Sequence, residues 1–359
     1  MMNPSRKITT VLTFFTLLLF SYQSHASPSP PVTALFVFGD STVDPGNNNY
    51  IPTIFRGNHS PYGIDFPGKL STGRFSNGKL TTDFLASFLG LKPTLPAYLD
   101  PTVQPGDLLT GVSFASAGTG LDDRTARLSS ALTMDKELTY FDEAVGKMKK
   151  AVGDGETNRV ISNALFVISV GTNDMTINLY DQPFGGFKSV SNYQDSLLNK
   201  LEGVIKRLYQ KGAKRFIVSG LPPIGCVPIQ ITIESLKQYP RMFKRACSDE
   251  QNNDSRFYNS KLQRLALRLN QSLSGSKILY LDIYSPILDM ITYPEKYGLE
   301  ETKRGCCGTG KVEAGPLCDT WSPTCEDPSK FLFFDSIHPS QTAYSSIAKN
   351  VSVSLFPLL

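Results

Sequence analysis

The stretch Ala34–Phe38 (ALFVF) is a short apolar run that leads directly into Gly39-Asp40-Ser41. Further runs of similar length and of β-branched or aromatic content are Leu165–Val170, Phe216–Ser219, Ile278–Ile283 and Phe331–Phe334. Continuous apolar runs of this length are typical of parallel strands that are covered on both faces. Segments of helical period alternate with these runs along the chain. The alternation predicts a single doubly wound α/β domain with a mainly parallel sheet.

The segments between the strands carry apolar residues at spacings of three and four, which indicates helices that pack on the sheet. The stripes are Leu138, Phe141, Val145, Met148 and Val152; Leu197, Leu201, Ile205 and Leu208; and Phe257, Leu262, Leu265 and Leu269. Gly212 is the expected stop of the second helix. A last helix is predicted to start at Ser340 and to bury Tyr344, Ile347 and Val351. Two long stretches without periodicity, residues 47–82 and 303–328, are expected to be surface loops.

Composition and charge exclude several classes of protein. The 359 residues include 28 Gly and 24 Pro, which are ordinary values and argue against collagen-like and disordered chains. Lys and Arg exceed Asp and Glu by 36 − 32 = 4, so the charge gives no reason to expect a nucleic-acid partner. The chain holds only three histidines. A multi-histidine metal centre is therefore not expected.

Residues 1–26 have the three-part pattern of a secretory signal peptide. Arg6 and Lys7 precede an apolar run at Val11–Phe20, and Ser24-His25-Ala26 places small residues before the expected cut. The run is too short to cross a bilayer core of ~30 Å as a helix, and no later stretch is long and apolar enough. We therefore expect a secreted, extracellular protein without a transmembrane anchor, with one domain over residues 27–359 and acting as a monomer.

The six cysteines agree with export, because an even number in an oxidising compartment is expected to pair. They are Cys226, Cys247, Cys306, Cys307, Cys318 and Cys325, with 15 connectivities formally open. A zinc site is the competing interpretation, but no CxxC or HxxxH spacing accompanies them. Cys306 and Cys307 are adjacent, so each is expected to pair elsewhere.

Four Asn-x-Ser triplets are candidate glycosylation sites in a secreted protein. They begin at Asn58, Asn253, Asn270 and Asn350. The first is followed by Pro61, which makes it the weakest of the four.

Small and polar residues follow four of the predicted strands. They are Gly39-Asp40-Ser41, Ser116–Gly120 after a further predicted strand at Val112–Ala115, Gly171–Asp174, and Asp335–His338. In open parallel sheets, ligands bind outside the carboxyl ends of the strands. Each cluster alone is compatible with ordinary turn chemistry. Four together favour a site at one edge of the sheet.

The chemistry that these clusters offer is acyl transfer. A serine hydroxyl needs a base to take its proton, and that base is usually a histidine held by a carboxylate. Removal of the predicted signal peptide would remove His25 and leave only His59 and His338. His59 does not follow a predicted strand. We predict Ser41 as nucleophile, His338 as general base and Asp335 as its orienting carboxylate. The alternative for Asp335 and His338 is that they cap the last helix.

A developing oxyanion needs donors that are fixed in place. The backbone N–H groups of Ser41 and Gly118 and the side-chain amide of Asn173 are the expected donors. The chain has no GxSxG elbow, which argues against the common α/β-hydrolase arrangement.

These motifs resemble those of a known protein family. Phe38–Asn49 is similar to the opening block of plant GDSL esterase/lipases, which belong to the SGNH hydrolases. The resemblance continues in Gly111–Gly118, Gly171–Asp174, Leu221–Cys226, Cys306–Gly310 and Asp335–Pro339. It implies a flavodoxin-like three-layer α/β/α sandwich, no metal or organic cofactor, hydrolysis of carboxylic esters, and the cell wall or apoplast as destination. It assigns Ser41, Asp335 and His338 to catalysis, and Ser41, Gly118 and Asn173 to the oxyanion hole.

Three positions depart from the family pattern. Thr42 replaces the leucine that gives the motif its name, Ser113 stands where asparagine is frequent, and Ala117 stands where a second glycine is frequent. Thr42 is expected to leave Ser41 in place, and Ala117 is expected to stiffen the oxyanion loop.

The leading hypothesis is a secreted, glycosylated serine esterase that works through an acyl-enzyme. An extracellular acyltransferase with the same site and a non-catalytic wall- or lipid-binding protein are the alternatives. Small-molecule, lipid and polysaccharide esters are all compatible substrates, because the loops carry no readable specificity code.

Overall fold

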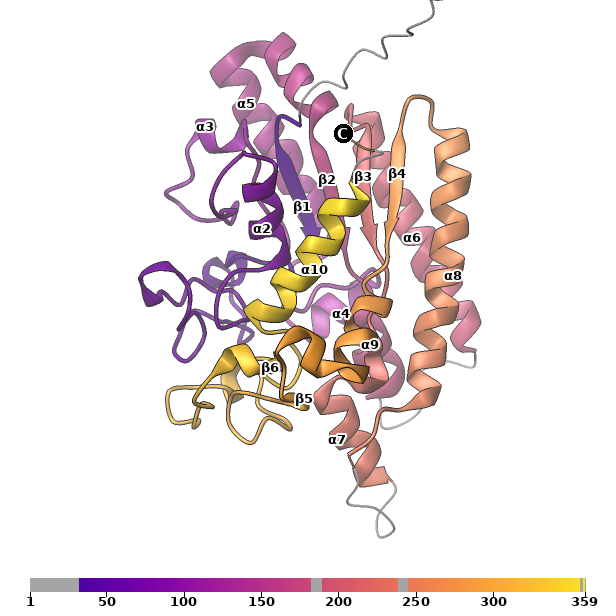
Figure 1. Ribbon diagram of the computed structural model, residues 1–359. Helices are drawn as coiled ribbons and strands as arrows, with labels where there is room; N and C mark the ends of the chain where they lie inside the picture. The colour runs from indigo at the N-terminus through magenta and orange to yellow at the C-terminus, as the bar shows by residue number, and fades with distance from the viewer. Residues whose placement is uncertain (1–31, 182–188, 238–244, 356–357, 359) are drawn as a thin grey trace, which may run out of the picture. The chain divides into compact units, whose positions relative to one another are not determined.

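Strand β1 (Leu35–Gly39) is the first strand of a four-stranded parallel sheet. The structure is a computed structural model that describes residues 32–181, 189–237, 245–355 and 358. Its neighbours are β2 (Leu165–Ser169), β3 (Arg215–Ser219) and β4 (Lys277–Leu281), in the order β1-β2-β3-β4. The strands are in register, so that Leu35 lies opposite Leu165 and Leu165 opposite Arg215. Their carboxyl ends therefore lie at one edge of the sheet (Figure 1).

The predicted strand Val112–Ala115 lies beside β1, on the side away from β2, but it is not a regular strand. Val37 N donates to Val112 O at 3.2 Å, and Phe114 N donates to Val37 O at 2.8 Å. The pairing gives only an isolated parallel bridge between Val37 and Ser113. With this segment counted in chain order, the sheet has the 2-1-3-4-5 order of flavodoxin-like folds, whose winding direction switches beside the first strand.

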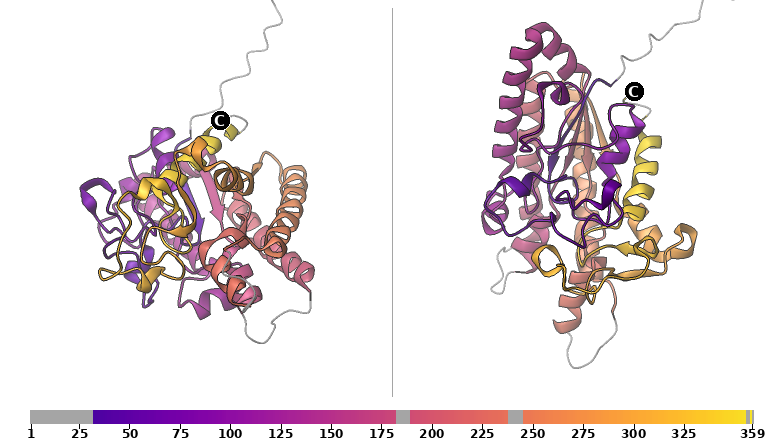
Figure 2. Two further views of the ribbon diagram at one scale, coloured as in Figure 1. Left: turned by 60° about the horizontal axis from the view of Figure 1, so that its bottom comes forward. Right: turned by 90° about the vertical axis from the view of Figure 1, so that its left-hand side faces the viewer.

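Alternate residues of each strand enter two different cores, which places helices on both faces of the sheet. Phe36, Phe166 and Phe216 pack with α5 (Met134–Asn163), α6 (Val190–Gln210) and α8 (Asp249–Ser272). Val37, Val167 and Ile217 pack with α2 (Thr81–Phe88), α9 (Tyr284–Thr292) and α10 (Gln341–Ser354). Figure 2 (right) shows the sheet between the two helix layers. This arrangement confirms the predicted α/β/α sandwich.

The remaining elements are short. The α-helices are α3 (Pro105–Leu108), α4 (Asp123–Leu128) and α7 (Pro228–Lys237). Turns of 3₁₀ helix are η1 (Asn47–Tyr50), η2 (Pro67–Lys69), η4 (Ile224–Cys226), η5 (Pro294–Tyr297), η6 (Gly315–Leu317) and η7 (Pro328–Lys330), and η3 (Asp174–Tyr180) is a π-helix.

The predicted helices are present, with one error in a buried face. Ser340 caps α10 by accepting a hydrogen bond from Ala343 N, and Tyr344 and Val351 are buried as expected. In α8 the predicted core residue Phe257 is 67% exposed, and its neighbour Tyr258 is fully buried instead. Only this first member of the stripe is wrong, because Leu262, Leu265 and Leu269 are buried. Tyr258 lies four residues before Leu262 and so shares its face of the helix, whereas Phe257 lies five residues before it.

The prediction for Phe331–Phe334 is wrong in one respect. Strand β6 (Phe331–Phe333) does not join the main sheet but pairs in parallel with β5 (Glu301–Gly305) in a second, two-stranded sheet. A four-residue apolar run shows that a segment is buried and extended, but it does not identify the strand with which the segment pairs. Phe334 then packs in a small cluster with Tyr62 and Phe75, below the loops that surround the site.

Two disulfides cross-link the second predicted loop, residues 303–328. The bonds are Cys306–Cys325, Cys307–Cys318 and, outside this loop, Cys226–Cys247. Each of the adjacent cysteines pairs elsewhere, as expected. The first loop differs from the prediction, because Tyr62, Arg74 and Phe75 within residues 47–82 are buried.

Residues Val32–Leu359 form one compact unit. The predicted signal peptide and the boundary at residue 27 lie outside the described residues. Among the residues that the structure describes, no helix has the length and apolar character needed to cross a membrane.

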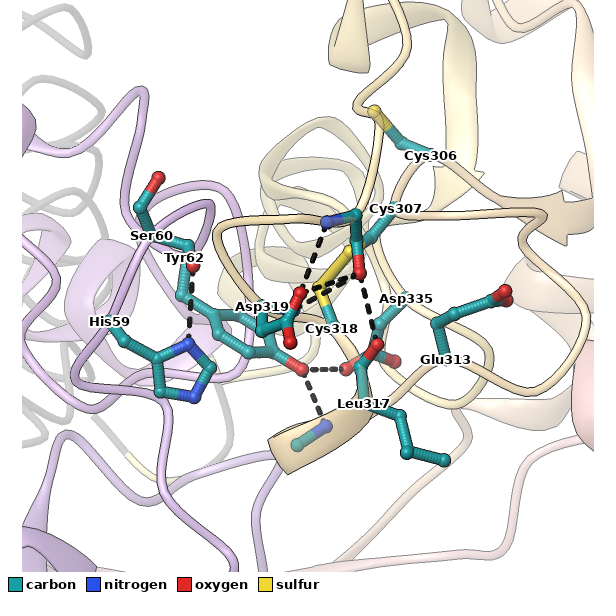
Figure 3. Close-up of a disulfide and its surroundings, with 12 residues drawn as sticks. His59, Ser60, Tyr62, Cys306, Cys307, Glu313, Leu317, Cys318, Asp319 and Asp335 are labelled. Atoms are coloured by element: carbon teal, nitrogen blue, oxygen red, sulfur yellow. Dashed lines mark hydrogen bonds between the residues drawn. A yellow bond between two sulfur atoms is a disulfide. The ribbon is translucent and has the colours of Figure 1, made fainter.

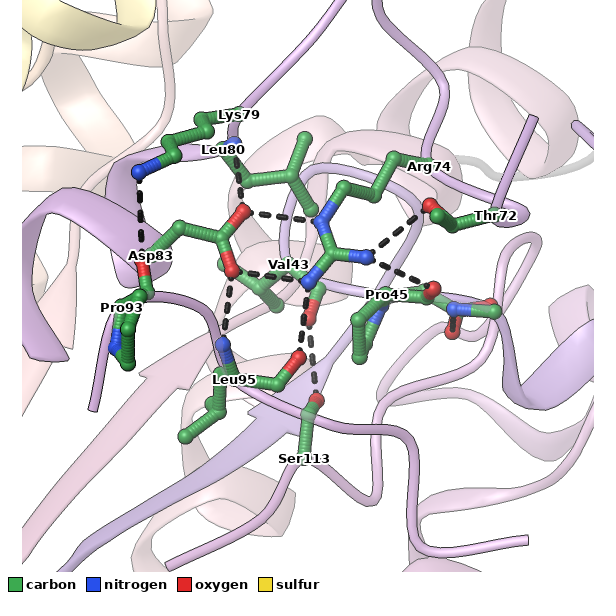
Figure 4. Close-up of polar contacts among 12 residues, drawn as sticks. Val43, Pro45, Thr72, Arg74, Lys79, Leu80, Asp83, Pro93, Leu95 and Ser113 are labelled. Atoms are coloured by element: carbon green, nitrogen blue, oxygen red, sulfur yellow. Dashed lines mark hydrogen bonds and ion pairs between the residues drawn. The ribbon is translucent and has the colours of Figure 1, made fainter. Parts of the chain in front are cut away.

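An ion pair anchors the first loop from within (Figure 4). Arg74 Nε and Nη2 donate to the two carboxylate oxygens of Asp83 at 2.8 Å each, and the side chains are 6% and 1% exposed. Leu80 N and Leu95 N also donate to this carboxylate, while Arg74 donates to the carbonyl oxygens of Pro45 and Leu95. The pair joins the loop to the start of α2 and to the segment that follows it.

Removal of one partner leaves the other charge buried without compensation. We expect Asp83→Ala to lower the free energy of unfolding by about 3–5 kcal/mol, measured by urea denaturation. The control is Glu156→Ala, which breaks the exposed Arg159–Glu156 pair and should leave stability unchanged. Equal effects of the two substitutions would contradict the structural role of Arg74 and Asp83.

Candidate active site

Ser41, His338 and Asp335 are joined by two short hydrogen bonds. Ser41 Oγ lies 2.8 Å from His338 Nε2, and His338 Nδ1 lies 2.7 Å from Asp335 Oδ2. Asp335 is fully buried, and Ser41 and His338 are 8% and 4% exposed. The structure thus brings together three residues that the sequence separates by up to 297 positions.

The carboxylate sets the protonation pattern of the imidazole. An ionised carboxylate only accepts hydrogen bonds, so Nδ1 of His338 carries the proton in the neutral ring. Nε2 is then a free acceptor for the Ser41 hydroxyl. Asp335 Oδ1 is occupied separately, by the backbone N–H groups of Ile337 (2.8 Å) and His338 (2.6 Å). The Asp-x-x-His spacing therefore folds into one tight turn that orients both side chains.

The end of β1 places Ser41 at the edge of the sheet. Gly39 has φ +134°, and a Cβ at this position would lie 1.9 Å from Ser169 O. Only glycine allows this approach between β1 and β2. Gly39 N donates to Glu137 Oε2 at 2.8 Å, and Asp40 N donates to Ser169 O at 3.0 Å. The backbone is held on both sides immediately before Ser41.

The motif position Thr42 has a structural role. Its hydroxyl donates to Asp40 Oδ1 at 2.7 Å, and its backbone N–H donates to the same atom at 3.0 Å. Burial raises the pKa of Asp40, and these two hydrogen bonds oppose the increase. Thr42 thus stabilises a carboxylate beside Ser41, which a leucine side chain would not do.

The segment Ser116–Gly120 carries the predicted donor Gly118. Gly118 has φ +94°, and a Cβ there would lie 2.5 Å from the Cβ of Ser129, so glycine is required. Asn173 Nδ2 donates to Thr119 O at 3.0 Å, which uses one of its two N–H bonds. Both residues line the same cavity as Ser41 and His338.

Two buried carboxylates hold this segment at its ends. Asp44 Oδ2 accepts from Ala117 N at 3.1 Å, while Asp174 accepts from Leu121 N and Asp122 N at 2.8 and 2.9 Å. Burial raises the pKa of Asp44 to about 6 and that of Asp174 to about 7, against the hydrogen bonds that favour their ionised forms.

A cavity of about 380 Å³ opens at the site. Ser41, Gly118, Asn173 and His338 line it together with Phe75, whose ring centroid lies 4.8 Å from that of His338. Four of the five predicted site residues therefore face one space, and Asp335 is buried behind His338, although β6, which leads to His338, belongs to the second sheet.

Tyr62 is an additional buried partner of Asp335 (Figure 3). Its hydroxyl donates to Asp335 Oδ2 at 2.6 Å and accepts from Gly315 N at 2.8 Å. The sequence carried no signal for this residue, since it is one of 15 tyrosines and lies in a loop without periodicity. Asp44 and Asp174, in contrast, lie inside the motif blocks, where their clustering with other polar residues is a detectable signal.

Other candidate residues lie apart from this site. Both ring nitrogens of His59 face backbone carbonyl oxygens, those of Arg56 and Ser60, and the residue does not line the cavity. The four candidate glycosylation positions are exposed. Asn58 lies in a loop, Asn253 and Asn270 lie in α8, and Asn350 lies in α10. The Asn270 amide is engaged with both N and O of Ile278. Glycosylation of these residues stays a prediction.

Comparison with known proteins identifies close relatives. GDSL esterase/lipase At2g40250 of Arabidopsis thaliana is 65% identical over 351 residues, which is 98% of this chain and 97% of the relative. GDSL esterase/lipase At2g31550 of the same plant is 44% identical over 355 residues, with 98% and 97% covered. A solved structure of a carbohydrate esterase is 12% identical with a TM-score of 0.36, covering 90% of this chain and 69% of that chain, a likeness too low to bear on the site.

The model of the GDSL-like Lipase/Acylhydrolase family matches residues 35–351. The match runs from the first residue of β1 into the last helix and includes every residue of the site described above. Together with the identity to the two plant relatives, it shows that the chain belongs to the GDSL-like lipase/acylhydrolase family.

Proposed function

We propose that the protein is a secreted serine esterase in which Ser41, His338 and Asp335 form the catalytic triad. Family membership makes the chain a carboxylic ester hydrolase; the residue roles and the secretion are the proposal. The observation that carries it is the pair of hydrogen bonds, 2.7 and 2.8 Å long, that links Asp335 through His338 to Ser41 in the wall of a cavity. The leader pattern at residues 1–26 and the three disulfides support secretion.

Acylation begins when Ser41 Oγ attacks the ester carbonyl carbon and its proton passes to His338 Nε2. The negative charge that develops on the carbonyl oxygen is stabilised by the N–H groups of Ser41 and Gly118 and by the Asn173 amide. The bond from the carbonyl carbon to the alcohol oxygen then breaks. His338 gives its proton to the leaving alcohol, and an acyl group remains on Ser41.

Deacylation repeats these steps with water. His338 Nε2 takes a proton from water as its oxygen attacks the acyl carbon, and the same donors stabilise the second oxyanion. The bond to Ser41 Oγ breaks, the proton returns from His338 to Oγ, and the carboxylic acid leaves. Asp335 stabilises the imidazolium in both halves and keeps its own charge throughout.

The nucleophile is tested by Ser41→Ala. We expect kcat/KM for p-nitrophenyl esters to fall roughly 10⁴-fold or more, because no covalent intermediate forms. A fluorophosphonate probe should label the wild type and fail to label the variant. Equal turnover by the two proteins, or labelling of the variant, would exclude Ser41 as nucleophile.

The oxyanion role of Asn173 is tested by Asn173→Ala. Loss of one donor should lower kcat roughly 10²–10³-fold with little change in KM, since the donor acts mainly in the transition state. The control is Asn163→Ala, at the opposite end of β2. Its side-chain amide donates to Arg159 O and Ser162 Oγ within α5, so this substitution should leave kcat unchanged. A change in KM alone would show that Asn173 binds substrate rather than the oxyanion.

A further inference from the structure

The cavity at the site extends from the triad into the interior, along the face of the sheet that α10 covers. Its walls include Val167 and Ile217 in the middle of β2 and β3, and Tyr344, Ile347 and Val351 on α10. From Tyr344 to Val351 the helix advances seven residues, or about 10 Å at 1.5 Å per residue. The space therefore extends over about two turns of α10, and Ser41 and His338 belong to the same lining.

The side chains between α10 and the sheet do not fill the space, as is expected of a binding site. Val167 lies in the centre of the sheet, yet it retains 5% exposure, whereas its strand neighbours Phe166 and Ile168 retain none. Val167 faces the cavity side, and these two neighbours face the opposite core. A volume of about 380 Å³ lies within the range of small-molecule sites, roughly 300–1,000 Å³. Apolar cavities of this kind exclude water and accept apolar ligands.

We propose that this cavity binds the acyl chain of the substrate, and that the preferred substrates are esters of unbranched, medium-chain fatty acids. The proposal rests on the proposed function, because the cavity opens beside the atom that would carry the acyl group. An acetyl group would leave the inner walls at Ile347 and Val351 without contact. A bulky polar sugar would have to leave its hydroxyl groups unpaired against aliphatic side chains.

The first test is a series of p-nitrophenyl esters from acetate through butyrate and octanoate to palmitate. Each methylene that enters the cavity should raise kcat/KM roughly fourfold, from the free energy of burying it. We expect a rise up to octanoate or decanoate and a fall at palmitate, when the chain exceeds the cavity. If acetate is hydrolysed as fast as octanoate while Ser41→Ala is inactive, the acyl-chain proposal fails and the serine esterase stands. If wild type and Ser41→Ala are equally inactive on every ester, the proposed function itself fails.

The second test changes the inner end of the cavity. Val351→Phe should lower the ratio of octanoate to acetate kcat/KM at least tenfold, and Val351→Ala should move the optimum toward longer chains. Val353→Phe is the matched control, since Val353 is on the same helix but 69% exposed, and its ratio should equal that of the wild type. The two substitutions at Val351 act in opposite directions, so a general loss of stability cannot mimic both. Unchanged ratios in both Val351 variants would overturn the proposal.

A separate observation concerns Tyr62, whose hydroxyl contacts the triad carboxylate from a distant loop. Because Gly315 N donates to the Tyr62 oxygen, the phenolic proton is directed to Asp335 Oδ2. Burial and the Asp335 charge raise the pKa of Tyr62, so the phenol keeps this proton. Gly315 lies in the loop that the Cys307–Cys318 disulfide closes, and the close-up shows the disulfide, Tyr62 and Asp335 side by side (Figure 3).

We infer that Tyr62 is a positioning residue that fixes Asp335 and shares its negative charge, and thereby sets the basicity of His338. The other ionisable groups that act on this pair are Asp40, which interacts with His338, and Tyr344, which interacts with Asp335. His59 packs edge-on against the Tyr62 ring, with centroids 5.5 Å apart. None of these groups donates a hydrogen bond to Asp335 among the described residues, so the phenol is the one side chain besides His338 that does so there.

Tyr62→Phe removes only the hydroxyl. The carboxylate should then stabilise the imidazolium more strongly, so the acidic limb of the pH profile of kcat/KM should move to higher pH. We also expect kcat at the optimum pH to fall about tenfold, because Asp335, held by one hydrogen bond fewer, orients the His338 ring less well. Tyr258→Phe is the control, since its buried hydroxyl has no hydrogen-bond partner among the described residues, and its profile should match the wild type. A lower kcat with an unshifted acidic limb would show a purely structural role and overturn the inference.

Discussion

The buried carboxylate of Asp335 is the constraint on which the rest of the site depends. A fully buried charge is costly unless hydrogen bonds replace its water. Four donors do so here: two backbone N–H groups of its own turn, the imidazole of His338 and the phenol of Tyr62. Because these donors come from the last turn before α10 and from the first long loop, one charge joins distant parts of the chain beside the cavity.

Buried carboxylates recur around the site, each placed where backbone N–H groups must be held. Glu137 accepts from Gly39 N, two residues before Ser41, and Asp44 and Asp174 accept from N–H groups in and just after the segment that carries Gly118. Burial raises the pKa of all three, although their hydrogen bonds favour the ionised forms. These groups cost stability as the pH rises through their raised pKa values, because the folded state then loses protons that it binds more tightly than the unfolded chain. Burial of these carboxylates therefore lowers stability, but their hydrogen bonds fix the backbone that would form the oxyanion hole.

Much of the fold and of the candidate site could be predicted from the sequence. Apolar runs such as Ala34–Phe38 indicate buried parallel strands, and the parallel arrangement places Ser41 and Asn173 at one edge. The scarcity of histidine left His338 as the expected base. Local patterns failed where a partner distant in sequence decides the structure. The run Phe331–Phe334 was recognised as extended but assigned to the wrong sheet, and Phe257 was assigned to the core in place of Tyr258.

The class of fold, the family motifs and the turn from Asp335 to His338 can be predicted from the amino-acid sequence alone. These depend on side-chain period and on short-range spacing, both of which can be read along the chain. Three features depend on the folded arrangement: Tyr62 donates to Asp335, Cys307 pairs with Cys318, and an apolar cavity lies between α10 and the sheet. A contact between loops and the space left between a helix and a sheet depend on packing in three dimensions, which no local pattern encodes.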